Sequence, residues 1–588
     1  MIAIATTMSR IRAPGRSLLL AGLLLVGLLS APDGCLAKTR FNVQTHAIYV
    51  EEPSDLSGDY EGAIGDFGVP LYGGSLAGEV RAPSTNRDGC DAFEDGAFEP
   101  AGWTDDDDDT PIIAMLERGG CYFVQKAYHA QLAGASAVII ADDRDEPLIT
   151  MTTPKNNPSA QSLVREIEVP TALVRKRLAD TIDRVLRSGD RVVLEMNWEE
   201  AMPNPDDRVE WELWTTSNDA CGASCEAQAE FKQDAANAAV ELQTHGFTSF
   251  VPHYKVRACD KMGLFSKEDC DRACIHGGRY CAVDHVAYPL NETVSGRDIV
   301  LENKRQLCIY DYLKREDQDH LWWRYVADFA RKCRTADGNF GEACSRQVQR
   351  SLAVAKPGAL VRDVERCMGD SMADTEHPLL ERERTHELER FKAGQGRITF
   401  LPTVIINTVQ YRGRLDSASV LRGICAGFEE LSEPGICLQD SLQVDECSTG
   451  HGCWINPDER LRDQYSSTCL DTFRGHICVC PKGYLGDGYE CEEMSACALG
   501  TADCDHLLDS WGVTETRGPV YTALEIVLIT FLSVLILASL GYVYYRCFHK
   551  KRMDREIRTI LEQYMPLEDK AEAERKQQKQ QEKKATTA

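Results

Sequence analysis

Basic residues are scarce in this chain of 588 residues. Its 65 lysines and arginines stand against 92 aspartates and glutamates, which gives a formal net charge of −27 at pH 7. Nucleic-acid binding needs a basic face that neutralises phosphates, so this balance argues against nucleic acid as a partner. Hydrophobic residues make up 43% of the chain. Most of it is therefore expected to fold, and its length allows several domains of roughly 100–200 residues each.

The motifs of several enzyme classes are also missing. There is no H-E-x-x-H, since His386-Glu387 lacks the second histidine, and no G-x-S-x-G. Their absence argues against a zinc peptidase and against a serine hydrolase. No C-x-x-C pair occurs either, which weakens both a zinc site and a thioredoxin-type redox site.

Long hydrophobic runs are limited to two. The first, Leu18 to Leu29, follows Arg10, Arg12 and Arg16 and is too short to span a bilayer, so residues 1–37 are predicted to be a cleaved signal peptide. The second, residues 520–545, reaches the roughly 20 residues that a membrane helix needs. Basic residues from Arg546 onward follow it directly. By the positive-inside rule, residues 546–588 form a cytosolic tail, and the chain is a single-pass type I membrane protein.

The cysteines fit this topology. Of the 24, Cys35 belongs to the signal peptide and Cys547 to the membrane boundary, and the remaining 22 all precede the membrane helix. An even number of lumenal cysteines is typical of disulfides formed in an oxidising compartment. Asn291, in Asn-Glu-Thr, is the predicted glycosylation site.

Residues 38–195 have the pattern of a mixed α/β domain. β-like runs at residues 111–116 and Ala137–Ala141 flank a helical stretch from Val124 to Gly134. Between them, Arg118-Gly-Gly-Cys-Tyr-Phe123 forms a turn in which Cys121 is a natural disulfide partner for Cys90. This turn, with Ile140-Ala-Asp-Asp143, resembles the protease-associated domain of plant vacuolar sorting receptors. The resemblance extends from Arg40 to Leu567.

That resemblance implies a cargo site at the turn. Beside two glycines, the Arg118 guanidinium can offer its fork of donors to a peptide carbonyl or carboxylate. The residues expected to contact cargo are Arg118, Gly119, Gly120, Tyr122 and Phe123, with Thr150 and Met151 as a second wall. Two positions depart from the family pattern, because Gly120 and Gln44 replace acidic residues. The alternative is a surface arginine beside aromatic residues that belong to the core.

Residues 196–440 are predicted to be a thioredoxin-like domain. A strand-like run at Val209–Thr215 precedes Cys221-Gly-Ala-Ser-Cys225 and a helical stretch from Glu226 to Gln243, and Leu401-Pro-Thr precedes a strand much later. The region from Cys259 to Cys367 is interpreted as a helical, cysteine-rich insertion. Cys221 and Cys225 are expected to form a structural disulfide. The alternative is a membrane-anchored thiol-disulfide oxidoreductase built on these two cysteines.

Residues 443–491 have the cysteine spacing of an EGF-like module. By resemblance, Cys447 pairs with Cys469, Cys453 with Cys478, and Cys480 with Cys491, and a module this small needs such disulfides to fold. Its sequence also has a calcium pattern, with side-chain ligands from Gln443, Glu446 and Asp471 and carbonyl ligands from Val444 and Thr472. An EGF-like module with no bound calcium is the alternative. Residues 492–517 form a cysteine-containing linker.

The tail contains Tyr564-Met-Pro-Leu567. Pro566 keeps this segment out of a helix, so that Tyr564 and Leu567 can enter the pockets of a clathrin adaptor. Glu556 with Ile560-Leu561 resembles a second, acidic-dileucine signal, or is simply the apolar face of a short helix.

Together these features predict a multidomain α+β protein: a protease-associated domain, a thioredoxin-like domain with a helical insertion, a disulfide-rich EGF-like module and one transmembrane helix. The resemblance implies a non-enzymatic vacuolar sorting receptor of the Golgi, clathrin-coated vesicles and prevacuolar compartment. Its implied partners are soluble cargo with an Asn-Pro-Ile-Arg-like sorting peptide, clathrin adaptors and Ca²⁺. A receptor carrying a RING ubiquitin ligase is disfavoured, because no cysteine follows Cys547.

Overall fold

The computed structural model describes residues 43–493, except 95, 99–109, 155–156, 263–265, 283–293, 450–451 and 463. The predicted signal peptide, membrane helix and tail with Tyr564 and Leu567 lie outside these residues, as do Asn291 and the predicted linker from residue 494 onward. The first two linker residues, 492 and 493, belong to strand β18 instead. Within the described part, no helix has the length and apolar character needed to cross a membrane. Residues Thr39–Met494 form one compact unit.

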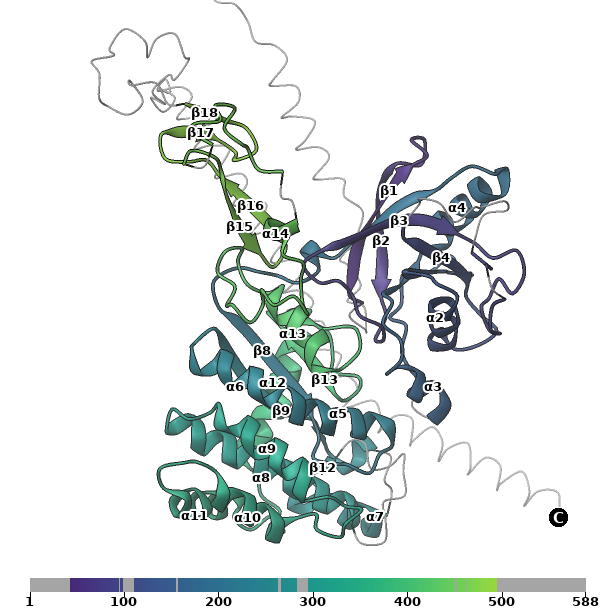
Figure 1. Cartoon of the computed structure of the whole chain (residues 1–588). Coiled ribbons are helices and arrows are strands. Elements are labelled where there is room, and N and C mark those ends of the chain that lie inside the picture. Colours follow the sequence, from purple (N-terminus) through teal and green to yellow (C-terminus); the bar gives the residue numbers. More distant parts are fainter. Residues whose placement is uncertain are drawn as a thin grey trace, which may run out of the picture. The chain divides into compact units, whose positions relative to one another are not determined.

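The N-terminal domain is a closed barrel with the strand order β1-β2-β6-β5-β4-β3-β7 (Figure 1). The pairs β3–β4, β4–β5 and β5–β6 are parallel. Every residue of β5 is buried, as expected for an apolar run that lies inside a parallel sheet. The strands are β1 Thr45–Glu52, β2 Gly58–Ile64, β3 Ser75–Arg81, β4 Ile112–Glu117, β5 Ala137–Ala141, β6 Thr171–Val174 and β7 Val193–Asn197.

Helices cover this barrel: α2 Phe123–Leu132, α3 Pro158–Leu163, α4 Lys176–Ser188 and the 3₁₀ turn η1 Glu199–Ala201. Val124 and Ala127 of α2 pack against Leu116 of β4 and Ile140 of β5 in one hydrophobic cluster. The helix begins directly after the turn that contains Arg118. The packing of α2 therefore fixes the position of that turn.

The second domain contains a four-stranded sheet in the order β14-β13-β8-β9. Strands β8 and β9 are parallel, and β13 is antiparallel to β8. This is the order of elements predicted for a thioredoxin-like domain. The elements are β8 Val209–Thr215, α5 Ala223–Asp234, α6 Ala236–Thr244, β9 Thr248–Tyr254, α12 Pro378–Ala393, β13 Thr403–Ile406, β14 Val409–Gln410 and α13 Ser417–Cys425.

An insertion between β9 and α12 is mainly helical, as predicted. It comprises η2 Cys259–Met262, α7 Lys267–Ala273, η3 His276–Gly278, α8 Gly296–Arg315, α9 Leu321–Lys332, α10 Glu342–Ser351 and α11 Pro357–Met368. It also contains a small sheet that the sequence did not indicate, formed by β10 Val256–Arg257, β11 Cys274–Ile275 and β12 Tyr280–Ala282. Strands this short show too little periodicity to be recognised.

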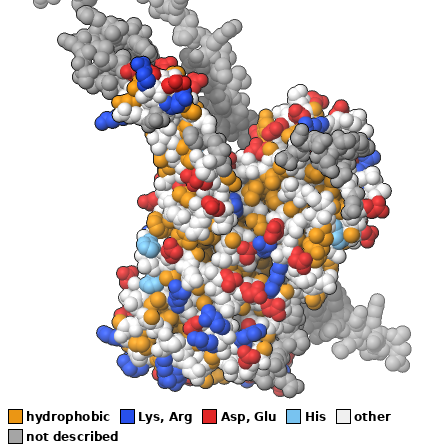
Figure 2. All heavy atoms as spheres, in the orientation of Figure 1, with side chains coloured by type: hydrophobic (Ala, Val, Ile, Leu, Met, Phe, Trp, Pro, Cys, Tyr) orange, Lys and Arg blue, Asp and Glu red, His pale blue; other side chains and the backbone are white. Residues whose placement is uncertain are grey.

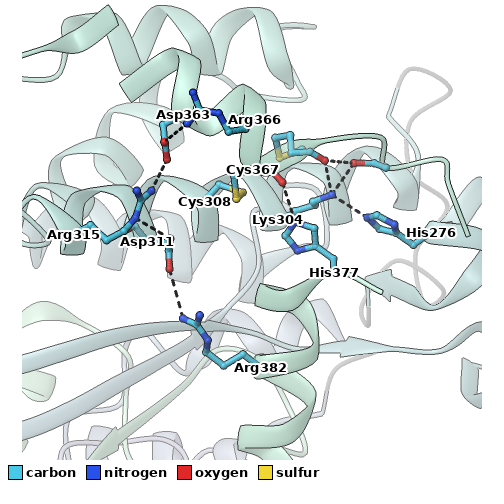
Figure 3. The surroundings of a disulfide bond; sticks show 12 residues. His276, Lys304, Cys308, Asp311, Arg315, Asp363, Arg366, Cys367, His377 and Arg382 are labelled. Carbon is cyan, nitrogen blue, oxygen red and sulfur yellow. Dashed lines mark hydrogen bonds and ion pairs between the residues drawn. A yellow bond between two sulfur atoms is a disulfide. The ribbon is translucent and has the colours of Figure 1, made fainter. Parts of the chain in front are cut away.

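Disulfides connect the helices of this insertion. Cys308 of α8 pairs with Cys367 of α11, and Figure 3 shows the charged residues around this bond. Nearby, the buried Lys304 donates from Nζ to the carbonyl of Met368 at 2.6 Å and to Ser371 Oγ at 3.0 Å. These partners compensate for burying the ammonium group. The other disulfides of residues 196–440 are Cys221–Cys225, Cys259–Cys270, Cys274–Cys281, Cys333–Cys344 and Cys425–Cys437.

The C-terminal module is held together by three disulfides, Cys447–Cys469, Cys453–Cys478 and Cys480–Cys491. This is the pairing that the resemblance implied. Its elements are α14 Glu446–Thr449, the hairpin of β15 Thr468–Thr472 and β16 Gly475–Val479, and the pair of β17 Tyr484–Gly486 and β18 Cys491–Glu493.

The barrel and the thioredoxin-like domain are joined by buried hydrogen bonds. The Tyr72 hydroxyl donates to the carbonyl of Arg412 at 3.0 Å and accepts from the Arg412 amide at 3.1 Å. The Arg414 amide donates to the carbonyl of Gly68 at 2.7 Å. Phe473, at the tip of the β15–β16 hairpin, lies against Gly73, where a Cβ would come within 2.7 Å of the phenyl ring. Gly73 therefore allows the hairpin to approach.

Candidate functional site

Arg118 lies in a cluster of three carboxylates. Its Nη1 donates to Asp142 Oδ1 at 2.7 Å and to Glu146 Oε1 at 2.9 Å, and its Nε is 3.6 Å from Asp143 Oδ1. Burial acts to lower the pKa of Arg118, but these hydrogen bonds outweigh it and raise the pKa. Nη2 has no hydrogen-bond partner in the described part of the chain. The carboxylates thus orient the guanidinium and leave one nitrogen for a ligand.

Gly120 has a neighbour that takes up the space of its absent side chain. Its φ is +76°, and a Cβ there would come within 2.4 Å of Asp88 Oδ2 and 2.7 Å of Cys90 Sγ. The Asp88 carboxylate thus lies where an acidic side chain at position 120 would begin. Cys90 is bonded to Cys121, so the disulfide and Asp88 together leave room only for glycine.

The other predicted cargo residues differ in exposure. Tyr122 is 44% exposed and precedes α2, whereas Phe123 packs partly against the cluster beneath that helix. Thr150 is partly exposed, but Met151 is fully buried, and its carbonyl accepts from the Asp66 amide at 3.0 Å. Arg118, Tyr122, Phe123 and Thr150 are therefore the members of the set whose side chains reach solvent, whereas that of Met151 does not. Gly119 has open space around it.

Two of the predicted calcium ligands of the C-terminal module, Gln443 and Asp471, are in contact. Gln443 Nε2 donates to Asp471 Oδ2 at 2.8 Å. The other oxygens of this pair, Gln443 Oε1 and Asp471 Oδ1, are buried and have no hydrogen-bond partner among the described residues. Burial, with Asp445 and Glu446 nearby, raises the pKa of Asp471. Unpartnered buried oxygens in an acidic setting fit an oxygen-coordinated cation such as Ca²⁺.

The two carbonyl ligands occupy different surroundings. Val444 is 63% exposed, whereas Thr472 is fully buried, with its hydroxyl donating to the carbonyl of Gly475 at 3.1 Å. In the sequence, Val444 directly follows Gln443, and Thr472 directly follows Asp471.

Cys221 and Cys225 form a disulfide and are both buried. Every cysteine in the described residues is paired in this way. Such complete pairing is typical of an oxidising compartment.

A histidine cluster that the sequence did not single out lies on the thioredoxin-like sheet. His386 Nε2 is 3.1 Å from Glu212 Oε1, and His253 Nδ1 is 3.0 Å from Glu383 Oε2. The two imidazole rings stack with their centroids 4.4 Å apart. Burial acts to raise the pKa of Glu212, but His386, His253 and Arg390 lower it to about 2. The partners come from β8, β9 and α12, so only the fold could reveal them.

Comparisons with known proteins agree with this architecture. The family described as "Vacuolar sorting receptor thioredoxin-like domain" matches residues 209–425, and the PA domain family matches residues 76–182. Vacuolar-sorting receptor 1 of Pisum sativum is 33% identical and covers 91% of this chain and 96% of its own length. Vacuolar-sorting receptor 4 of Arabidopsis thaliana is 34% identical, over 94% of this chain and 97% of its own.

A third relative, Vacuolar-sorting receptor 2 of Arabidopsis thaliana, is 38% identical over 82% of this chain and 75% of its own length. Among solved structures, an aminopeptidase from Aneurinibacillus sp. strain AM-1 is 17% identical, covers 26% of this chain and 30% of its own, and has a TM-score of 0.18. That likeness is too low to support an argument.

The fold and the matches define a class of protein in which a protease-associated domain is joined to a thioredoxin-like domain. With similarity to the receptors over about nine-tenths of its length, the chain belongs to the vacuolar-sorting receptor family.

Proposed function

We propose that this receptor binds soluble vacuolar proteins through a short sorting peptide at the turn that contains Arg118. The observation that carries the proposal is the Arg118 guanidinium, whose Nη1 is held by Asp142 and Glu146. A ligand carbonyl or carboxylate can then accept from Nη2 without reorienting the side chain. The exposed Tyr122 supplies an aromatic surface beside it.

The acidic residues around Arg118 also suit a basic sorting peptide. Three carboxylates surround one guanidinium, and the side chains of Asp143 and Glu146 are 50% and 35% exposed. The arginine of an Asn-Pro-Ile-Arg-like peptide can pair with these exposed carboxylates while its backbone accepts from Arg118.

Ca²⁺ is the cofactor of this proposal. Gln443, Glu446 and Asp471 would hold it through side-chain oxygens, with carbonyls from Val444 and Thr472. The ion would neutralise the acidic cluster and stabilise the hairpin whose Phe473 contacts Gly73 of the barrel domain.

Sorting completes the proposal. The receptor would collect cargo in the Golgi and recruit clathrin adaptors through Tyr564 and Leu567 of a cytosolic tail, behind a membrane helix at residues 520–545. It would release the cargo in a prevacuolar compartment. No catalytic step is assigned to the chain.

The site is tested by replacing Arg118 with alanine and with lysine. Both changes remove the planar set of guanidinium N–H donors, but lysine keeps a cation beside the buried Asp142. A charge-assisted hydrogen bond contributes about 1.5–3 kcal/mol, so both variants should bind an immobilised sorting peptide roughly tenfold or more weakly.

Arg144→Ala is the matched control, because the Arg144 side chain is 64% exposed and its one ion pair among the described residues is with Asp143, at 3.7 Å. It should bind as the wild type does. Wild-type affinity in the two Arg118 variants would refute the site, and thermal unfolding of each variant checks that the barrel is intact.

A further inference from the structure

A short segment of the helical insertion is held in place by polar contacts rather than by apolar packing. Residues 369–377 connect α11 to α12, and none of residues 369–376 is buried. Met372, the one large hydrophobic residue of this segment, is 61% exposed. The attachment of the segment to the rest of the insertion therefore depends on hydrogen bonds.

His276 links the segment to the buried Lys304 of α8. The His276 amide donates to the carbonyl of Ser371 at 2.8 Å, and its Nδ1 lies 3.1 Å from the carbonyl oxygen of Ala373. A carbonyl oxygen only accepts, so Nδ1 carries the proton of the neutral imidazole and Nε2 is left as an acceptor. Lys304 Nζ lies 2.9 Å from that Nε2 and donates to it. A buried ammonium group thus uses a neutral histidine as one of its acceptors.

His377 ends the segment and also depends on being neutral. Its amide donates to the Tyr280 hydroxyl at 3.1 Å, and its Nε2 donates to the carbonyl of Cys367 at 2.9 Å. The rings of His377 and His276 are 5.7 Å apart, both beside the Lys304 side chain (Figure 3). Nδ1 of His377 is buried and has no hydrogen-bond partner among the described residues. A proton there would bury a charged donor without an acceptor.

The surroundings of the two imidazoles favour their neutral forms. Burial and then Lys304 lower the pKa of His276, although the Ala373 carbonyl and Asp370 act to raise it. Burial lowers the pKa of His377 to about 4, against the hydrogen bond to the Cys367 carbonyl. Lys304 and His276 lower it further.

The other charged groups nearby do not offset the cost of protonation. Asp370 is exposed, and its Oδ1 accepts from the Met372 amide at 2.9 Å. Figure 2 shows acidic and basic side chains intermingled over the helices, and exposed charges are screened by salt. The remaining charged or titratable groups around the contact pair with one another: Arg279 with Asp374 at 2.8 Å, Tyr280 with Glu381 at 2.7 Å and Arg384 with Glu381 at 2.8 Å.

Acid therefore weakens these contacts. A proton on Nε2 of His276 removes an acceptor of Lys304 and brings two cations together at a buried site. The two folded histidines bind protons less readily than ordinary histidines, whose pKa is about 6.5. The attachment of the segment is thus fully present at pH values above about 6.5, and it is lost as the pH falls below that value.

The packing on both sides limits how far the opening can spread. The disulfide between Cys308 and Cys367 fixes the end of α11 to α8 (Figure 3). At the start of α12, Leu379 and Leu380 are buried. The helices that flank the segment therefore stay anchored when its own contacts break.

We propose that residues 369–377 are an acid-sensitive segment, which protonation of His276 and His377 releases from α8 while the flanking helices stay folded. The inference goes beyond the proposed function and does not depend on it. The segment belongs to the insertion of the thioredoxin-like domain, whereas the cargo turn with Arg118 belongs to the barrel.

Hydrogen–deuterium exchange of the purified full-length receptor at pH 7.0 and pH 5.0 tests this release. The amides of His276 and His377 report it, because each donates to a group on the other side of the contact. Their protection factors, corrected for the intrinsic effect of pH on exchange, should fall at least roughly tenfold at pH 5.0, which lies more than one pH unit below the ordinary histidine pKa. The amides of the central strand β8 should keep their protection.

Two variants assign the effect to these histidines. In the double variant His276→Gln, His377→Gln, an amide oxygen can accept from Lys304 and an amide nitrogen can donate to the Cys367 carbonyl, but neither side chain takes up a proton in this pH range. The double variant should keep its protection at pH 5.0. His245→Gln is the matched control, because His245 is exposed at the end of α6, and it should lose protection at the segment as the wild type does.

Three results would overturn the inference. Unchanged protection of the wild type at pH 5.0 would do so whether or not the variants fold. An equal loss in the double variant would mean that another group titrates. A simultaneous loss in β8 would mean that acid unfolds the whole domain. None of these results bears on peptide binding at Arg118, so the proposed function is tested separately.

Discussion

By the resemblance to the receptor family, Gly120 in the Arg118 turn replaces an acidic residue, and its surroundings leave no room for a side chain there. The Asp88 carboxylate approaches from the neighbouring loop to within 2.4 Å of where a Cβ would be. A carboxylate therefore lies at this point of the turn, and Asp88 supplies it.

Whether the Asp88 carboxylate excludes a side chain at position 120 can be tested by substitutions at both positions. Gly120→Asp should lower the midpoint of thermal unfolding for two reasons. The new side chain collides with Asp88, and a non-glycine residue is strained at the backbone φ of +76°. Adding Asp88→Gly should recover part of the loss, since it removes the colliding carboxylate while the Cys90 sulfur remains 2.7 Å from the Cβ position. Gly119→Asp, at a φ of +110° with nothing within 4 Å, measures the backbone strain alone. Equal losses at positions 119 and 120 would contradict the account.

His386 should make stability depend on pH. Its hydrogen bond to Glu212 raises the pKa of His386, against the effect of burial, and Glu383 adds to the rise while Arg390 opposes it. The imidazolium of His386 therefore stabilises the fold fully at pH values below about 6.5, the ordinary pKa of a histidine. This contribution is lost as the pH rises through the raised pKa of His386 in the folded protein. His386→Gln should lower the unfolding midpoint at pH 5.5 more than at pH 8.5. An equal effect at both pH values would show that the histidine is neutral throughout.

Sequence reasoning predicted the Arg118 turn and its disulfide, but not the partners of Arg118. Asp142 and Glu146 are 24 and 28 residues away, and they meet Arg118 because β4 and β5 pair in parallel. Asp142 and Asp143 belonged to the sequence pattern that resembles the vacuolar sorting receptors. Their contact with the guanidinium required the register of the two strands.

At the scale of elements, the C-terminal module should depend on calcium. Adding Ca²⁺ to chelator-treated receptor should raise its unfolding midpoint, because the ion would partner Gln443 Oε1 and Asp471 Oδ1, which are buried without hydrogen bonds among the described residues. Asp471→Asn should abolish the rise. Asp458→Asn changes a partly exposed carboxylate of the same module, paired with Arg460, and should keep the calcium-dependent rise. A calcium effect that survives Asp471→Asn would place the ion elsewhere.

Acidification should weaken this calcium binding. The pKa of Asp471 is raised by burial and by Asp445 and Glu446, so protons compete with the ion as pH falls through that value. Calorimetric titrations at neutral and mildly acidic pH should show lower affinity at the acidic one. Unchanged affinity would mean that Asp471 is not a ligand.

The elements themselves were largely predictable where hydrophobic patterns were long. The apolar run at Ala137–Ala141 and the run at Val209–Thr215 form β5 and β8 with the expected bounds. The stretch from Glu226 to Gln243 proved to be two helices that meet at Ala235. The strand expected after Leu401-Pro-Thr begins at Thr403, directly after Pro402, which cannot donate to a sheet.

For the whole molecule, the sequence revealed the domains but not what lies between them. A cavity of about 920 Å³ between the barrel and the thioredoxin-like domain is lined by Asp66, residues 146–154, residues 223–227 and residues 397–415. No periodicity links such distant segments, and only the docking of the two domains brings them together. The hydrogen bonds of Tyr72 to Arg412 belong to the same junction.

The central claim is that this member of the vacuolar-sorting receptor family recognises a short sorting peptide. Its most direct test is calorimetric titration of the purified full-length receptor, in Ca²⁺ at neutral pH, with an Asn-Pro-Ile-Arg peptide and with the same residues in scrambled order. The account predicts saturable binding of the first peptide at one site per chain and at least roughly tenfold weaker binding of the second. Equal affinity for both peptides would contradict it.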